Sequence, residues 1–155
     1  MDNVLFIKSI IMFELLLGHL MGDYLLQNEW MAMNKSKNTW IGWLSASVHC
    51  IIYTLAVCLF MWNFDPIWII VVFLSHFPID KFMLAEKYLH FIKGKGLKDY
   101  VNKNGFFYNH SNLPKPHGEL NRYDALEGGF TALVYTVTDN AMHLILMWGA
   151  YQIIY

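Results

Sequence analysis

Histidine and aspartate recur one helical turn apart in segments that are otherwise apolar. Three such pairs occur: His19 with Asp23, His76 with Asp80, and Asp139 with His143. Residues four apart lie on the same face of an α-helix, so the two side chains of each pair can reach one point. Imidazole and carboxylate groups in this arrangement can bind one transition-metal ion, or one can orient the other. The spacing predicts a metal site assembled from several helices.

A lone histidine in the segment "SASVHCIIY" completes the set of candidate ligands. The expected ligands are His19, Asp23, His49, His76, Asp80, Asp139 and His143. Four imidazoles and three carboxylates are more than one tetrahedral ion needs, so one or two ions with an open position are expected. This donor set favours zinc over calcium or magnesium and leaves manganese and iron open. An aspartate outside the ligand set would be the general base, with Asp23, Asp80 and Asp139 as candidates.

The elements that carry these residues have the composition of membrane helices. The 155-residue chain is 56% hydrophobic and only 15% charged, whereas soluble domains are about 25% charged. Four apolar segments, near residues 4–27, 40–62, 66–90 and 130–155, approach the roughly 20 residues that cross a bilayer. We therefore expect an all-α fold: a single domain over residues 1–155, a four-helix transmembrane bundle with a polar loop at residues 93–129.

The basic residues predict the orientation of this bundle. Lys35 and Lys37 lie in the first loop, and six further lysines and arginines lie between the third and fourth segments. By the positive-inside rule both loops are cytoplasmic, and both termini lie outside a bacterial inner membrane. In that topology all seven candidate ligands fall in the cytoplasmic half of the bundle. The basic third loop could be an inside marker with affinity for lipid headgroups, or a lid over an anionic substrate.

Other polar residues have narrower expected roles. Gln27 and Lys35 lie on the cytoplasmic side of the candidate site and are expected to bind an anionic headgroup or phosphate. His110 and His117 lie in the polar loop, and whether they reach the site is left open. Cys50 and Cys58 are expected to be buried thiols. With a net charge of −1, the expected partners are membrane lipids rather than nucleic acid, with a homo-oligomer left open.

The stretches "GHLMGDYLLQNEWMAMNKSK", "ASVHCIIYTL", "SHFPIDKF" and "TDNAMHLI" resemble a known family in order and spacing. It is the bacterial and phage membrane-protein family catalogued as domain of unknown function 3307. The resemblance covers the four helices but not the loop at residues 93–129, and it implies the architecture and the His/Asp site rather than a reaction. Lys35 falls where that family has a lysine after the first helix. More loosely, the design is similar to membrane-bound metal-dependent hydrolases.

Three functions are compatible with this pattern. The first is a membrane-embedded metal-dependent hydrolase that acts on a phosphate ester or lipid-linked substrate at the cytoplasmic face. The second is a transporter or channel for metal ions or protons, since intramembrane histidine and aspartate chains serve that role too. The third is a non-catalytic interaction protein whose polar centre holds its helices together. Bound metal separates the first two from the third.

Overall fold

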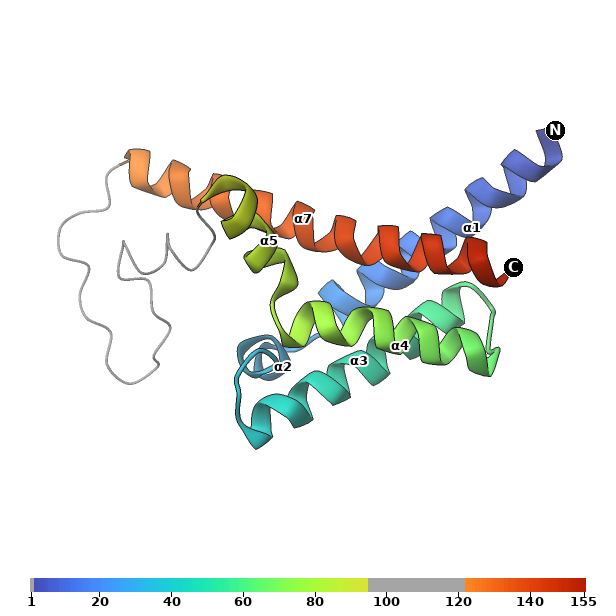
Figure 1. Cartoon of the computed structure of the whole chain (residues 1–155), viewed down its shortest axis with the longest axis horizontal. Helices are drawn as coiled ribbons and strands as arrows, with labels where there is room; N and C mark the ends of the chain where they lie inside the picture. The colour runs from blue at the N-terminus through green and yellow to red at the C-terminus, as the bar shows by residue number, and fades with distance from the viewer. Residues whose placement is uncertain (1, 95–121) are drawn as a thin grey trace. The chain divides into compact units, whose positions relative to one another are not determined.

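The computed structural model describes the backbone of residues 2–94 and 122–155, and in these residues every regular element is a helix (Figure 1). This confirms the all-α prediction for the described residues. The elements, in chain order, are α1 Asp2–Leu20, the π-helix η1 Met21–Leu25, α2 Glu29–Asn34, α3 Trp40–Phe60, α4 Pro66–Lys81, α5 Leu84–Lys93 and α7 Arg122–Ile154.

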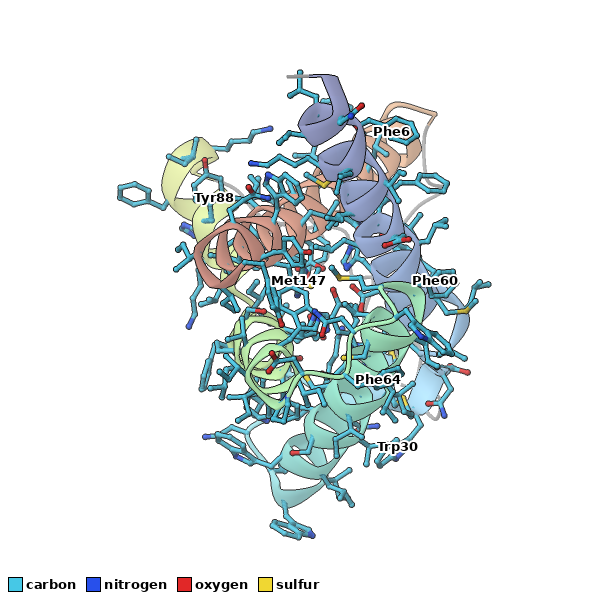
Figure 2. All side chains as sticks on the ribbon, turned by 90° about the vertical axis from the view of Figure 1, so that its right-hand side faces the viewer. Phe6, Trp30, Phe60, Phe64, Tyr88 and Met147 are labelled. Atoms are coloured by element: carbon cyan, nitrogen blue, oxygen red, sulfur yellow. The ribbon has the colours of Figure 1, made fainter. Side chains whose placement is uncertain are left out.

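Two helical stretches are long and apolar enough to cross a membrane, Asn3–Leu25 and Trp40–Phe60. A third is added if α4 and α5 together form one bent span. Large apolar side chains on these helices are exposed, as on the α1 residue Phe6, which points away from its helix in Figure 2. Exposed apolar surface of this extent is what a lipid environment covers. The chain thus has two or three candidate spans, as a membrane protein does.

The fourth predicted span, near residues 130–155, is not among these candidates. It belongs to α7, a 33-residue helix that begins at Arg122, inside the range predicted to be loop. The consecutive polar residues Thr138, Asp139 and Asn140 lower the apolar character of this helix. The remainder of the predicted loop, from residue 95 to 121, lies outside the described residues.

Two further local features differ from the expected helix boundaries. The third predicted helix is interrupted, because Met83 has a φ of 51° between α4 and α5. A left-handed conformation at a non-glycine residue ends the regular hydrogen-bond pattern. The first loop contains a short helix, α2, whose N-terminus is capped by the Asn28 side chain accepting from the backbone N–H of Met31 over 2.9 Å.

The chain divides into two compact units, residues 1–83 with 141–155, and residues 84–140. The single-domain prediction stays a prediction. In the first unit α3 packs against α1, η1, α2 and α4. The core of this unit is mostly apolar and fully buried: Leu15, Tyr53, Val57, Cys58, Trp68, Val72 and Met147. Cys50 and Cys58 are free and buried, as expected.

Two glycines, one in α1 and one in η1, let this part of the chain approach α3 closely. A Cβ at Gly18 would lie 2.7 Å from the Cα of Val57, and a Cβ at Gly22 would lie 2.6 Å from Cδ2 of Tyr53. Glycines four apart are a common device for close helix contact in membranes. They bracket His19 and precede Asp23, so the close approach brings those side chains to α3.

Candidate metal centre

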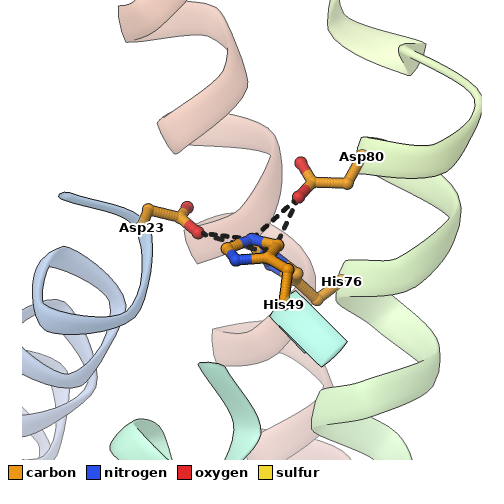
Figure 3. Close-up of side chains that lie close together, drawn as sticks. All are labelled: Asp23, His49, His76 and Asp80. Carbon is orange, nitrogen blue, oxygen red and sulfur yellow. Dashed lines mark hydrogen bonds and ion pairs between the residues drawn. The ribbon is translucent and has the colours of Figure 1, made fainter. Parts of the chain in front are cut away.

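Four donor side chains converge from three different helical segments. Asp23 comes from η1, His49 from α3, and His76 and Asp80 from α4 (Figure 3). One donor atom of each residue lies within 4.8 Å of the others. His49 and His76 are fully buried, and Asp80 is 5% exposed. Burial of two carboxylates is costly unless positive charge or hydrogen-bond donors lie beside them.

The local backbone positions these groups. Asp23 lies in a five-residue π-helix, whose wider turn is closed by a bond from the Leu26 N–H to the Met21 carbonyl over 3.0 Å. Single turns of π-helix are frequent at functional sites. On α4, His76 and Asp80 are one turn apart, and Pro78 lies between them inside the helix. The role of Pro78 in aiming the two side chains stays a prediction.

The donor atoms are spaced as metal ligands are. Nε2 of His49 lies 3.0 Å from Nε2 of His76, and the two lie 2.9 and 3.2 Å from Asp80 Oδ2. Asp23 Oδ1 lies 3.2 and 3.4 Å from the same two nitrogens. Ligands of a tetrahedral ion with bonds of about 2.0–2.1 Å are about 3.3 Å apart. These separations therefore fit a cation at the centre of the four atoms.

The hydrogen-bonding pattern also fits a cation. Each imidazole Nε2 faces the other one and two carboxylate oxygens, but it can carry only one proton. Asp23 Oδ1 is buried and competes with Asp80 Oδ2 for the single proton that each Nε2 can carry, at 3.2 and 3.4 Å from the two nitrogens. A buried acceptor in this state is costly unless an ion or water satisfies it. Two imidazoles and two carboxylates form a donor set for zinc, iron or manganese.

Tyr53 supports two of the histidines. Its ring stacks on the His76 ring at 3.5 Å between centroids and 18° between planes. Its hydroxyl lies 2.8 Å from Nδ1 of His19 and 3.3 Å from the sulfur of Met147. Sequence reasoning missed this residue, although Tyr53 follows His49 by one helical turn. Stacking fixes the His76 ring, whose Nδ1 has no hydrogen-bond partner in the described residues.

Two more of the expected ligands lie beside the four-residue cluster. His19 Nδ1 is 3.4 Å from Asp23 Oδ2, whereas His49 and His76 lie near the other oxygen, Oδ1. His143 Nε2 is 3.8 Å from Asp80 Oδ1, and its ring lies 4.1 Å from that of His76. His19 is close enough to help orient the Asp23 carboxylate, whereas His143 lies beyond hydrogen-bond distance of Asp80.

Both residues expected to bind an anion contact the cluster directly. Lys35 Nζ donates to Asp80 Oδ2 over 2.6 Å. The amide nitrogen of Gln27 lies 3.2 Å from Nδ1 and 3.1 Å from Nε2 of His49. One cationic and one amide donor therefore lie at the edge of the candidate metal site.

For the remaining predicted site residues, the structure gives less information about their role or position. Asp139 is half-buried on α7, one turn before His143, in the second unit of the chain, and its role as ligand or base stays a prediction. His110 and His117 lie outside the described residues. The number of ions also stays a prediction.

Apolar helices and a buried His/Asp cluster together define a helical membrane protein with a candidate metal centre. Residues 11–155 match the family model described as "Protein of unknown function (DUF3307)", and the chain belongs to that family. This confirms the resemblance noted from the His and Asp motifs. The match also includes residues 93–129, which the resemblance was not expected to cover. No curated protein and no solved structure matches the chain.

Proposed function

We propose that this protein is a membrane-embedded metal-dependent hydrolase with its metal centre at Asp23, His49, His76 and Asp80. The observation that carries the proposal is the convergence of four donor atoms from three helical segments at the mutual distances of metal ligands. The bundle would have four spans in a bacterial inner membrane, with both termini outside and the centre in the cytoplasmic half. Zinc is the favoured ion.

The two imidazoles and Asp80 are the best candidates for permanent ligands. Their donor atoms have the shortest mutual distances, 2.9 to 3.2 Å. Asp23 Oδ1 lies at the fourth position of a tetrahedral site, so water or substrate would bind there by displacing Asp23 or as a fifth ligand. A metal ion bound there would lower the pKa of its bound water and polarise a phosphoryl or acyl oxygen.

Asp23 is the best candidate for the general base. Its side chain is 11% exposed, against 3% for Asp80, and its Oδ1 stands slightly further from the two imidazoles. His19 contacts the other carboxylate oxygen and would hold the group in place. Once displaced from the ion, the Asp23 carboxylate could take a proton from water bound in the site.

The proposal is tested with a phosphate ester. Protein loaded with Zn²⁺ in detergent is assayed with p-nitrophenyl phosphate and with phosphatidic acid, beside Asp23→Asn and the control Asp65→Asn. Asp65 caps α4 through the N–H of Ile67, and asparagine caps equally well. We expect about a 100-fold or greater loss of kcat in Asp23→Asn alone. Turnover unchanged by Asp23→Asn would contradict its role as base.

A second function, proton or metal-ion transport, is favoured by one specific observation. The rings of His19, His143, His76 and His49 form a series with successive centroid distances of 5.5, 4.1 and 5.1 Å. Histidine and carboxylate series inside membranes carry protons in pumps and transporters. Proteoliposomes with an internal pH dye would show proton flux under a potential if this function held, whereas a hydrolase would show none.

A further inference from the structure

Lys35 places a positive charge on the same oxygen atom that the metal would use. Its Nζ lies 2.6 Å from Asp80 Oδ2, and this oxygen is also 2.9 Å from Nε2 of His49 and 3.2 Å from Nε2 of His76. The Lys35 side chain is 19% exposed, whereas that of Asp80 is 3% exposed. The ammonium thus reaches a buried ligand from the edge of the site.

The turn that carries Lys35 is fixed from outside the centre. Lys81 Nζ donates to the carbonyl oxygens of Lys35 and Lys37, over 3.3 and 2.7 Å. The same ammonium lies 4.5 Å above the ring of Trp43, and Lys81 is only 4% exposed. These contacts hold the backbone of Lys35, so only its side chain has to move for its ammonium to leave Asp80.

We propose that Lys35 is a tethered cation that competes with the metal for Asp80 and is drawn off it by an anionic group of the substrate. This inference rests on the proposed metal centre and deepens it. A metal ion and an ammonium on one carboxylate oxygen repel each other, so Lys35 lowers the metal affinity of the centre without substrate. It also neutralises the buried carboxylate when no metal is bound.

The charge balance indicates the class of substrate. Asp23 and Asp80 contribute two negative charges, a divalent ion two positive charges and Lys35 one more, since metal-bound imidazoles are neutral. The loaded site therefore carries about one excess positive charge. A phosphate group would neutralise that positive charge and accept a hydrogen bond from the Lys35 ammonium. Metal and phosphate should bind with positive cooperativity, and linkage makes that cooperativity reciprocal.

Zinc titration measures the competition directly. Wild type, Lys35→Gln, Lys35→Arg and Lys37→Gln are titrated in nanodiscs of phosphatidylcholine, with free Zn²⁺ buffered by a chelator in the submicromolar range. Lys37 is the matched control, because it lies in the same turn and its Nζ bonds to Asn34 Oδ1 rather than to the cluster. We expect Lys35→Gln to bind Zn²⁺ about tenfold more tightly than wild type, and the other two variants to resemble wild type.

Anion coupling is measured on the same proteins. Inorganic phosphate should tighten Zn²⁺ binding to the wild type about fivefold or more, and this effect should be lost in Lys35→Gln. In a parallel arm, phosphatidic acid is added to the nanodiscs in place of inorganic phosphate. Coupling with phosphatidic acid alone would assign a lipid headgroup, and coupling with inorganic phosphate would assign a soluble phosphate. Absence of coupling in both arms would overturn the proposed role of the anion.

The failure of this inference is distinguishable from the failure of the metal centre. If the wild type binds Zn²⁺ and Lys35→Gln binds it equally or more weakly, then Lys35 does not compete with the metal for Asp80, and the metal centre itself is not contradicted. Absence of Zn²⁺ binding in the wild type would contradict the centre itself. If Lys35→Gln does not fold, Lys35→Met takes its place in both titrations.

Discussion

At the scale of single residues, Tyr53 contributes to the centre without belonging to its donor set. Its hydroxyl contacts His19 and Met147, and its ring stacks on His76. Tyr53→Phe removes the hydroxyl contacts and keeps the stacking. We expect it to lower the free energy of unfolding by about 1 kcal/mol and to weaken metal binding up to about tenfold. Thermal unfolding and Zn²⁺ titration in detergent measure these two effects.

The control for this substitution is Tyr88→Phe. Tyr88 lies on α5 and is 51% exposed, so removal of its hydroxyl should leave both measurements near the wild-type values. A wild-type metal affinity in Tyr53→Phe, together with the expected loss of stability, would show that Tyr53 serves packing alone.

Residue spacing anticipated much of this centre. The pairs His19 with Asp23 and His76 with Asp80 lie together, and His49 meets both carboxylates. Tyr53 was missed because an aromatic residue in an apolar helix is usually a packing residue, although its spacing from His49 was a usable signal. The contact between Lys35 and Asp80 joins residues 45 positions apart. Helical periodicity predicts which residues of one helix share a face, but it does not predict contacts between residues so far apart in the sequence.

At the scale of elements, the close approach of α1 and η1 to α3 determines whether Asp23 reaches His49. Gly18→Ala would place a Cβ 2.7 Å from the Val57 backbone, where no flexible side chain can yield. We expect a loss of about 1–3 kcal/mol in the free energy of unfolding and weaker metal binding. Thermal unfolding in detergent measures the first effect.

Gly149→Ala is the matched control for Gly18→Ala. Gly149 also lies in a helix, but a Cβ there would meet nothing within 4 Å. Alanine is the better helix former, so this variant should gain up to about 1 kcal/mol. Equal stability of the two variants would contradict the close helix contact.

Helix positions were easier to predict from the sequence than helix ends. The starts of α3 and α4, at Trp40 and Pro66, agree with the predicted apolar segments, and in the structure Thr39 and Asp65 cap these helices. The break after α4 was not predictable, because Met83 shows no sequence signal for a positive φ. The early start of α7 was missed because the chain before residue 130 is polar and glycine-rich.

At the scale of the whole molecule, the proposed four-span topology predicts that the two termini share one side of the membrane. Cys50 and Cys58 are buried and give a low background for thiol labelling. A cysteine at the exposed position Ser36 should react only from the cytoplasmic side, and one added after Tyr155 only from the outside. Labelling of intact cells with a membrane-impermeant maleimide measures this. Reaction of Ser36→Cys from outside would contradict the proposed orientation.

The most direct test of the account is the metal content of the protein. It is purified in detergent without chelator and analysed for bound elements, beside the double variant His76→Ala, Asp80→Ala and the control His90→Ala on α5. We predict one or two zinc, manganese or iron ions per chain in the wild type and in the control, and none in the double variant. A folded wild-type protein without bound metal would contradict the metal centre. It would favour a series of histidines that carries protons, or a polar network with a structural role.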